Sequence, residues 1–328
     1  MEQNILLKVS NISKTYKIRK GEWVKAVDDI SFSVKKGEIF GLLGPNGAGK
    51  TTTVKMICAL IRGDSGEILV NGINNVKKRT KALRSISAVL EGNRNIYWRL
   101  TVRENLEFFA ALKGKNPQKI KDKIDYYIDF FNLREKEKVT ASNLSRGMQQ
   151  KLAIATALVS GTEIILLDEP TLGLDVKASY EIRDLLKRIA KENGTTIIIT
   201  THDMSVVQEI CERVIIINNG AIIAEDRVEN LMKLFDTKSY RFVVEGKLTS
   251  QQEELFEKID QVVAVEKNSK TEITFNSADT SLFYQIIEVL KAENSIIESI
   301  SQKEVNFEKV FMEIIEEGDK NGKNSAVV

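Results

Sequence analysis

In the first two thirds of the chain, segments with the hydrophobic pattern of a strand alternate with segments that have the pattern of a helix. Short apolar or alternating runs, typical of strands, lie at residues 5–9, 23–34, 38–43, 65–71, 86–90, 163–167, 195–200, 213–217 and 221–225. Apolar residues at helical spacing lie at residues 50–61, 102–113, 117–131, 144–159 and 177–193. This alternation predicts an α/β fold with a mostly parallel sheet and helices on its faces.

Two parts of this pattern predict subdomains. The first two strands flank a polar loop at residues 17–22, so we expect them to pair antiparallel in a β subdomain. The helices between about residues 101 and 160 predict a helical subdomain, with Thr101 as the cap of its first helix.

The pattern changes near residue 239. From there we expect strands at 240–245, 262–266, 272–276 and 295–301, and helices at 250–259, 281–293 and 306–315. The order β-α-β-β-α-β is that of a ferredoxin-like unit, here with an added helix. The chain therefore predicts a first domain at 1–235, a small α/β domain at 239–316 and a disordered tail at 317–328. The second domain holds no cluster of His, Cys or carboxylates, so we predict no chemistry there.

Composition narrows the class of protein. The chain has 328 residues, enough for two domains, with 48 Lys and Arg against 46 Asp and Glu. Because both signs are interspersed, a nucleic-acid partner held by bulk charge is not expected. We interpret Lys77-Lys78-Arg79 as a solvated loop and REKEK, at residues 134–138, as a charged surface turn.

The cysteines and the N-terminus favour a cytosolic compartment. Cys58 and Cys211 lie in apolar helical contexts, so buried, reduced thiols are expected. The first ten residues lack the basic and apolar regions of a signal peptide. No run reaches the 18 or so apolar residues that span a bilayer, so any membrane role is expected to come through a partner.

The stretch GLLGPNGAGKTTT, residues 41–53, has the pattern of a P-loop, which predicts a nucleotide site and a P-loop NTPase core. Within it Gly44, Gly49, Lys50 and Thr51 have the spacing G-x-x-x-x-G-K-[ST]. Glycines at the tight positions let successive backbone N–H groups curl round a phosphate. Lys50 would reach the β- and γ-phosphates, the Thr51 hydroxyl would ligate Mg²⁺, and the following helix would point its positive end at the anion.

Two further motifs narrow the chemistry. IILLDEP, at 164–170, would deliver Asp168 to the sheet edge beside the P-loop to hold Mg²⁺, and Glu169 to orient the attacking water and accept its proton. Alone, this pair is also compatible with a helix cap. LSRGMQ, at 144–149, places Ser145 and Gly147 at another anion-binding helix end. A second such end implies a γ-phosphate shared with another subunit.

With these motifs the chain resembles the ATP-binding subunit of an ABC transporter, over about residues 5–234. Residues 144–148 match the family's LSGGQ signature, with Arg146 in place of a glycine and Met148 in place of the glutamine. Residues 172–175 match the D-loop, which crosses the dimer interface in that family. The resemblance implies ATP contacts from Tyr16, Gly44, Pro45, Asn46, Gly47, Ala48, Gly49, Lys50, Thr51, Thr52, Ser145, Gly147 and Asp175.

The resemblance also assigns two isolated residues. A lone histidine is usually structural, but His202 matches the switch histidine that contacts the γ-phosphate and aligns Glu169 with the water, so Lys50, Glu169 and His202 form the expected catalytic set. By residue type alone Tyr16 is either a half-buried strand aromatic or an adenine platform; the resemblance implies the platform.

One position departs from the family pattern. The family usually carries a glutamine after the strand at 86–90, where it senses Mg²⁺ and water, and here Glu91 occupies that position. The expected metal ligands are therefore Thr51, Asp168 and Glu91. A shifted alignment would give the role to Asn93 or Asn95 instead.

The partners follow from the resemblance. Two copies, or one copy and a homologue, would close head-to-tail on two ATP molecules with Mg²⁺, and hydrolysis would drive a separate integral membrane permease. The permease would contact the region 91–100, where Tyr97 and Trp98 are either partner-facing or part of the helical subdomain's core. The region after Tyr240, which ends in residues 305–315, resembles the C-terminal extension of ATPases that serve exporters of drugs, antibiotics or polysaccharides. The implied location is the cytoplasmic face of the membrane.

Two other functions remain at this point. One is a soluble ABC ATPase that acts on a ribosome, DNA or an assembly complex; ribosomal members usually carry two ATPase units, and DNA-repair members insert a long coiled coil for which this chain has no room. The other is a regulatory module without turnover, disfavoured because Lys50, Asp168, Glu169 and His202 are all present.

Overall fold

The computed structural model divides the chain into two compact units, the first extending to Val228 and the second beginning at Glu229. It describes residues 4–18, 21–92, 95–233, 238–257, 259, 262–267, 269–277, 281–303, 311–312 and 315. The tail expected at 317–328 lies outside these residues, as does most of the helix expected at 306–315. The division falls before the boundary expected at 235–239, and part of that boundary also lies outside the described residues.

A four-stranded antiparallel sheet, in the order β2-β1-β4-β5, forms the expected β subdomain of the first unit. Its strands are β1 (Ile5–Lys17), β2 (Trp23–Lys35), β4 (Ser65–Val70) and β5 (Ile73–Asn74). β1 runs well past the apolar stretch that predicted it, because its polar half stays paired with β2 through Lys17↔Trp23.

The central sheet has six strands in the order β10-β9-β3-β8-β7-β6. They are β3 (Ile39–Leu43), β6 (Ile86–Val89), β7 (Ile164–Asp168), β8 (Thr196–Thr201), β9 (Arg213–Asn218) and β10 (Ala221–Arg227). All neighbours from β9 to β6 pair parallel, and β10 pairs antiparallel with β9. Every residue of β3, β7 and β8 is buried, which explains why these strands read as continuous apolar or β-branched runs.

The main core of the first unit lies between the antiparallel and central sheets, around α1 (Lys50–Ile57). α1 is shorter than expected because Ala59 adopts a left-handed conformation, with φ 50°, that ends the helix. Other helices are α2 (Arg79–Ala82), α6 (Val176–Asn193) and α7 (Met204–Ile210), and α8 (Val228–Lys233) begins at the division and continues into the second unit. Of these, only α6 was expected from the sequence.

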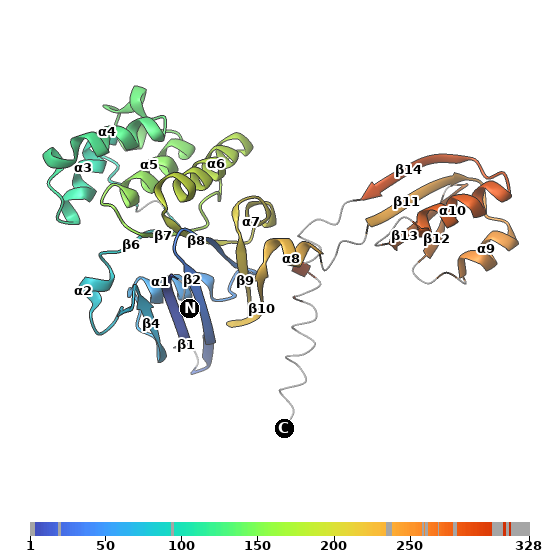
Figure 1. Ribbon diagram of the computed structural model, residues 1–328, viewed down its shortest axis with the longest axis horizontal. Coiled ribbons are helices and arrows are strands. Elements are labelled where there is room, and N and C mark those ends of the chain that lie inside the picture. The colour runs from blue at the N-terminus through green and yellow to red at the C-terminus, as the bar shows by residue number, and fades with distance from the viewer. Residues whose placement is uncertain are drawn as a thin grey trace. The chain divides into compact units, whose positions relative to one another are not determined.

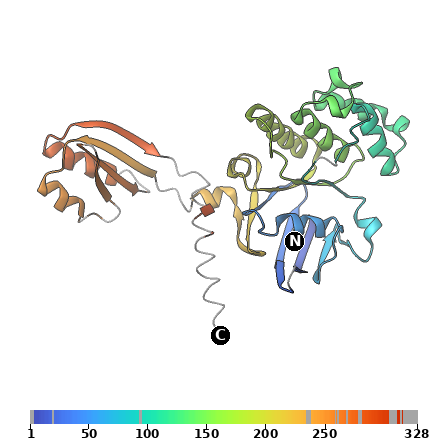
Figure 2. The ribbon, with the colours of Figure 1, turned by 180° about the vertical axis from the view of Figure 1, so that it is seen from behind.

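The helical subdomain consists of α3 (Val102–Leu112), α4 (Lys121–Phe130) and α5 (Arg146–Leu158), with short 3-10 turns η1 (Pro117–Ile120), η2 (Arg134–Lys136) and η3 (Ala141–Asn143). Thr101 caps α3 as expected, in a capping box with Glu104. Within this unit the three helices gather at the end away from β1, β2 and β4 (Figures 1 and 2).

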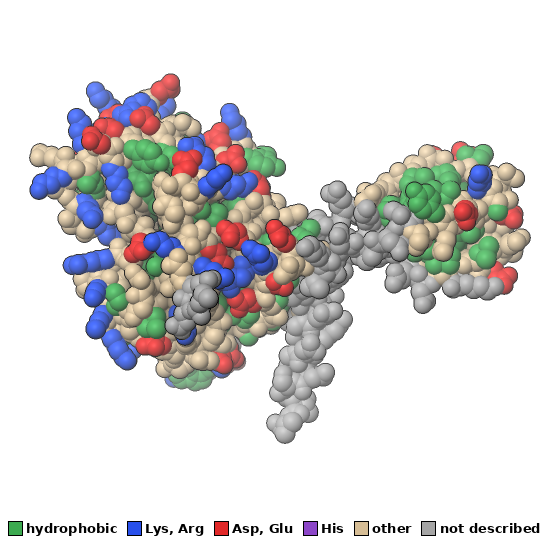
Figure 3. Space-filling view, in the orientation of Figure 1, with side chains coloured by type: hydrophobic (Ala, Val, Ile, Leu, Met, Phe, Trp, Pro, Cys, Tyr) green, Lys and Arg blue, Asp and Glu red, His purple; other side chains and the backbone are tan. Residues whose placement is uncertain are grey.

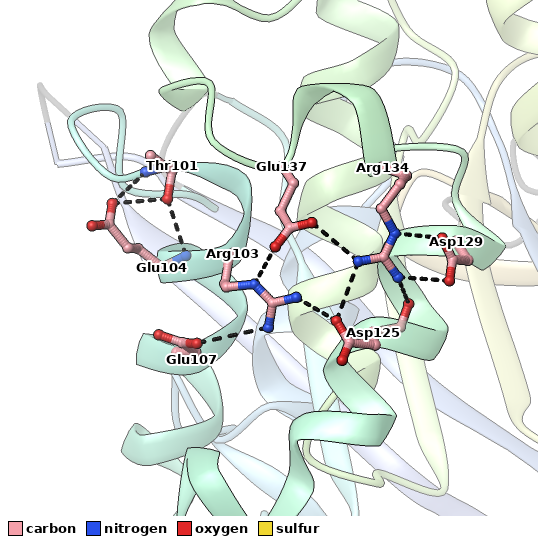
Figure 4. Close-up of polar contacts among 8 residues, drawn as sticks. All are labelled: Thr101, Arg103, Glu104, Glu107, Asp125, Asp129, Arg134 and Glu137. Carbon is pink, nitrogen blue, oxygen red and sulfur yellow. Dashed lines mark hydrogen bonds and ion pairs between the residues drawn. The ribbon is translucent and has the colours of Figure 1, made fainter.

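An ion-pair network ties α3, α4 and η2 together (Figure 4). Arg103 pairs with Asp125 and Glu137, and Arg134 pairs with Asp125, Glu137 and Asp129, the last at 2.6 Å. Hydrogen bonds from Arg103 and Arg134 hold the pKa values of Asp125 and Glu137 below their ordinary values, and a hydrogen bond from Arg134 does the same for Asp129, although desolvation opposes each shift. The charged segment that begins at Arg134 therefore links three elements and is not the simple surface turn that its composition predicts.

The second unit has the expected ferredoxin-like order. Its elements are β11 (Lys238–Glu245), α9 (Ser250–Glu257), β12 (Val262–Lys267), β13 (Lys270–Ser277), α10 (Ser281–Ala292) and β14 (Ile297–Lys303). The four strands form an antiparallel sheet in the order β12-β13-β11-β14. This unit has a core of its own, in which Phe242 and Phe275 stack with ring centroids 5.7 Å apart.

Candidate functional site

Three adjacent parallel strands bring the predicted motifs to one edge of the central sheet. β8 lies between β3 and β7, and all three run the same way. The P-loop follows β3, Asp168 ends β7, and His202 follows β8. The carboxyl edge of a parallel sheet is where α/β proteins bind ligands, so this edge is the candidate nucleotide site.

Two glycines of the P-loop, Gly44 and Gly49, are required by close backbone packing. A Cβ on Gly44 would lie 2.2 Å from the Ile217 carbonyl oxygen, and one on Gly49 would lie 2.3 Å from that of Ala26. Gly49 also has φ 108°, a conformation that other residues rarely adopt, at the start of α1. Besides giving a phosphate access to the backbone, as expected from the sequence, these two glycines let the loop pack on β9 and β2, which fixes its shape.

Lys50 is held over the loop by backbone oxygens. Its Nζ donates to the carbonyls of Gly44 at 2.6 Å and Pro45 at 3.1 Å, and lies 3.9 Å from Glu169 Oε1. Burial lowers the pKa of Lys50, and the nearby carboxylates, led by Glu169, oppose that shift without cancelling it. An ammonium group in this position faces the loop that would hold phosphates.

Asp168 and Thr51 supply oxygen ligands that suit Mg²⁺. The Thr51 hydroxyl donates to both carboxylate oxygens of Asp168, at 3.2 and 3.1 Å, and Thr200 donates a further, shorter hydrogen bond to Oδ1. A buried carboxylate beside a hydroxyl fits an ion that prefers octahedral oxygen coordination and takes its other ligands from phosphates and water. In the described part of the chain, no group of three or more His, Cys, Asp or Glu forms a metal site by itself.

Glu169 lies at the centre of the site in a strained conformation. Its φ is 51°, in the left-handed region, and its N–H donates to the Thr200 carbonyl at 3.0 Å. Its side chain is 9% exposed, and Oε1 lies 2.9 Å from Nδ1 of His202. The backbone thus turns the carboxylate away from the buried strand and towards the P-loop and His202.

A pocket of about 490 Å³ joins most of the predicted residues. It is lined by Ala26, Asn46, Gly47, Ala48, Gly49, Lys50, Thr51, Thr52, Glu91, Glu169, Leu172 and His202. Glu91 is exposed at its rim. The amide of Asn95 hydrogen-bonds Leu90 and Gly92 in its own loop, which favours Glu91 for the glutamine position, and Asn93 lies outside the described residues.

Tyr16 does not line this pocket. It lies on β1, opposite Val24 of β2, with 37% of its surface exposed, and Lys14 Nζ is 5.6 Å from its ring. The ring is therefore accessible, as an adenine platform has to be.

The signature residues and the D-loop acid lie outside the pocket of their own chain. Ser145 caps α5 by accepting from the Met148 N–H, and Asp175 caps α6 by accepting from the Ala178 N–H. A Cβ on Gly147 would lie 2.9 Å from Cβ of Ala178, so the two helix starts are in contact. The structure therefore brings Ser145, Gly147 and Asp175 together at two helix starts, and none of the three lines the pocket that contains Lys50, although Leu172 of the D-loop does.

Some contributors were not identified from the sequence. Thr200 hydrogen-bonds Asp168 and Glu169, yet in the sequence it is one more β-branched residue of a strand. Only its position next to β7 reveals the role. Cys58 and Cys211 are free and buried as expected, and burial raises the pKa of each thiol to about 12.

Comparison with known proteins identifies the family. A model of the ABC transporter family matches residues 27–172. The chain is 35% identical over 243 residues to the ABC transporter ATP-binding protein NatA of Bacillus subtilis, covering 74% of this chain and 98% of NatA. It is 32% identical over 303 residues to the methionine import ATP-binding protein MetN 2 of Bacillus licheniformis, covering 90% and 88%.

A solved structure agrees. The dimeric post-hydrolysis state of the ATP-binding cassette MJ0796, bound to ADP and Pi, superposes with a TM-score of 0.61 at 30% identity, covering 68% of this chain and 98% of that one. None of the helices among the residues placed by the structure is long and apolar enough to cross a bilayer. From the P-loop edge and these similarities together, the chain belongs to the ABC transporter family, as one of its ATP-binding subunits.

Proposed function

We propose that this ATPase, which as a family member binds ATP with Mg²⁺ and couples hydrolysis to transport, works as a dimer that drives a separate membrane permease. The observation that supports the dimer is the distribution of the motifs. One chain's pocket contains Lys50, Glu169 and His202, whereas Ser145 and Gly147 lie elsewhere. Two chains placed head-to-tail would complete two sites.

In this proposal each polar group of the site has one task. Lys50 and the P-loop N–H groups would bind and orient the phosphates, and Thr51 and Asp168 would hold the metal. The metal would neutralise charge on the phosphate oxygens. Glu169 would orient the attacking water and accept its proton, and His202, 2.9 Å from Glu169, would fix the direction of that carboxylate.

Exposed apolar side chains support a second chain at the D-loop. Leu172, Val176 and Tyr180 are 51%, 74% and 53% exposed, respectively, along the D-loop and the first turns of α6. Apolar and aromatic side chains exposed together are typical of protein contacts. This surface adjoins Asp175 and the signature residues that would face the other chain's ATP.

We place the permease contact beside the loop that follows Glu91. Tyr97 is packed against Phe108, with centroids 4.5 Å apart, yet remains 51% exposed, and Trp98 is 40% exposed. A groove of about 410 Å³ runs between β6, α3 and α5, and Leu60 and Leu112 are exposed in its lining. A helical end of a permease would fit such an apolar groove, with the ATPase at the cytoplasmic face of the membrane.

For the direction of transport we propose export, from the likeness of the C-terminal region to the extension of exporter ATPases. One observation favours import as a second candidate. The match to the methionine import protein covers 90% of this chain and therefore extends into the second unit. ATP-dependent uptake into inverted vesicles would indicate export, and uptake into right-side-out vesicles would indicate import.

The dimer is tested with Glu169→Gln, which keeps the shape of the side chain and removes the proposed base. We expect ATP to convert this variant from monomer to dimer in size-exclusion chromatography with light scattering, and hydrolysis to fall by at least about 100-fold. Glu163→Gln, at the start of β7 away from the pocket, is the matched control. A variant that stays monomeric with ATP at high concentration would exclude the head-to-tail dimer.

The partner is tested by pull-down of tagged Glu169→Gln protein from detergent-solubilised membranes, with and without ATP. Co-purification of one polytopic membrane protein is expected and would supply the permease whose cargo can then be assayed. Recovery of ribosomes or another soluble complex, without a membrane protein, would instead favour the soluble class of ABC ATPases.

A further inference from the structure

A buried arginine outside the pocket connects the D-loop helix with the segment that carries His202. Arg183, on α6, is 7% exposed. Its guanidinium donates to Glu209 of α7 at 2.8 Å and to Ser179 of its own helix at 3.1 Å, and lies 3.8 Å from Asp203. Each of these contacts joins elements that are separate in the sequence or fixes the rotamer of the arginine itself.

Asp203 is the residue directly after His202. It caps α7 by accepting from the Ser205 N–H at 2.9 Å, and its own N–H donates to Thr201 at the end of β8. Burial raises the pKa of Asp203, but hydrogen bonds from α7 and the charge of Arg183 reverse that shift, so its pKa lies below the ordinary value. The backbone N–H of Asp203 is therefore bonded to the residue before the histidine, and its carboxylate to the start of α7 after it.

Arg183 holds α7 at two points. Glu209 lies near the end of α7 and Asp203 at its start, so one guanidinium faces both ends of a short helix. Lys187, one turn further along α6, also pairs with Glu209, at 2.8 Å. α7 is thus fastened to α6, whose N-terminus is the D-loop acid Asp175.

The arrangement is costly for the protein. Nε of Arg183 is buried and finds no hydrogen-bond partner within the described part of the chain. A buried, incompletely paired arginine is weak support for stability, since apolar residues of similar volume often serve as well. Its contacts instead fix the position of α7, which begins two residues after His202.

We propose that Arg183 is a positioning residue for ATP hydrolysis, which sets the His202–Glu169 hydrogen bond by clamping α7 against the D-loop helix. This rests on the catalytic roles proposed for His202 and Glu169. Because Arg183 touches neither the P-loop nor the pocket, it acts on the alignment of the carboxylate and not on ATP affinity. A shift of the D-loop helix is then transmitted to His202 through this clamp.

The test compares Arg183→Met, Arg183→Lys and Glu209→Gln with the control Arg188→Met, an exposed arginine of the same helix. For Arg183→Met we expect kcat to fall about tenfold, because small misalignments of a reacting group cost this much or more, while KM for ATP is retained. Glu209→Gln should lower kcat less than Arg183→Met does, and Arg183→Lys should retain part of the kcat that Arg183→Met loses.

A second readout separates positioning from general damage. His202 is the only histidine in the sequence, so in untagged protein with ¹³Cε1-labelled histidine the NMR spectrum has one imidazole signal. We expect this signal to shift in Arg183→Met and Glu209→Gln and to stay in place in Arg188→Met. An unmoved signal in Arg183→Met, or an equal loss of kcat in Arg188→Met, would overturn the proposal. Wild-type kcat in His202→Ala would instead refute the catalytic role of the histidine.

Discussion

The backbone conformation of Glu169 determines where its carboxylate lies in the site. Its left-handed backbone costs about 1–3 kcal/mol for a non-glycine residue, and the two Thr200 contacts to its N–H hold it there. The same turn places the carboxylate between Lys50 and His202. The strain therefore accompanies the placement of the carboxylate at the edge of the sheet, where it faces the pocket.

Glu91 offers a test at the same scale. Glu91 lies exposed at the rim of the pocket, where water screens its charge. A solvated charge contributes roughly 1 kcal/mol at contact distance, so Glu91→Gln should keep kcat within about fivefold of wild type. The measurement is steady-state phosphate release, with Glu169→Ala as the inactive reference. Activity as low as in that reference would mean that the carboxylate of Glu91 takes part directly in metal binding or in the chemistry.

The sequence predicted which residues belong to the candidate site better than it predicted the contacts that hold them in place. Lys50, Asp168 and Glu169 were predicted from spacing and from strand ends, because parallel strands present their carboxyl ends together, whereas His202 was assigned by the family resemblance. Arg183 and Thr200 were not found, since no local pattern marks a residue whose partner comes from a distant element. The positive φ of Glu169 was likewise invisible, because it depends on the neighbouring strand β8.

At the scale of elements, the side-chain amide of Asn105 holds the backbone of residues 97–101 in place. Asn105 of α3 is fully buried, accepts from the Tyr97 N–H and donates to the carbonyls of Tyr97, Leu100 and Thr101. These bonds fix the loop that presents Tyr97 and Trp98.

Asn105→Ala should therefore lower the free energy of unfolding by about 2 kcal/mol, because the backbone groups of this loop lose the four hydrogen bonds that the buried amide makes. Urea unfolding followed by circular dichroism measures the loss. Gln118→Ala, at an exposed amide in the same subdomain, is the control and should be neutral. Equal stability of the two variants would show that water replaces the amide in this loop.

The ion-pair network of the helical subdomain gives its stability a dependence on pH. The folded-state pKa values of Asp125, Asp129 and Glu137 lie below their ordinary values, so this contribution is present at neutral pH and is lost as the carboxyls become protonated in acid. Arg103→Met should lower Tm at pH 7, and the difference from wild type should shrink between about pH 5 and pH 3. Arg84→Met, at an exposed arginine, should lower Tm at neither pH. A constant difference across that range would assign the effect to packing of the arginine stem.

Element types were mostly predictable, because the apolar periodicity of the longer helices and strands is unambiguous. The short helices α2, α7 and α8 were missed, since a helix of a few residues shows less than two turns of any pattern. The link between η2, α3 and α4 was missed for another reason. Charged residues in a turn look solvated until the arginine of another helix is found beside them.

At the scale of the whole molecule, the candidate nucleotide site lies within the first unit. Each unit has its own hydrophobic core, and every residue of the pocket lies before Val228. On the face shown in Figure 3, acidic and basic side chains are interspersed over the first unit.

A chain ending at residue 237 should therefore hydrolyse ATP with the kcat and KM of the full protein. The comparison uses purified proteins of equal folded fraction, judged by circular dichroism, in the same phosphate-release assay. A folded fragment with reduced kcat would show that the second unit contributes to turnover, and so would point to regulation by that unit.

The strand order of the central sheet also has a consequence for how the protein is made. β3, the apolar strand that leads into the P-loop, has β8 and β9 as its partners, and the hydrogen bond from Gly37 to Thr196 spans 159 residues of chain. At about 5–20 residues per second, the segments that pair with β3 are synthesised about 8–30 s after β3 itself. The nucleotide site is thus assembled late, and a truncated nascent chain exposes its most apolar strand to chaperones before it can bind ATP.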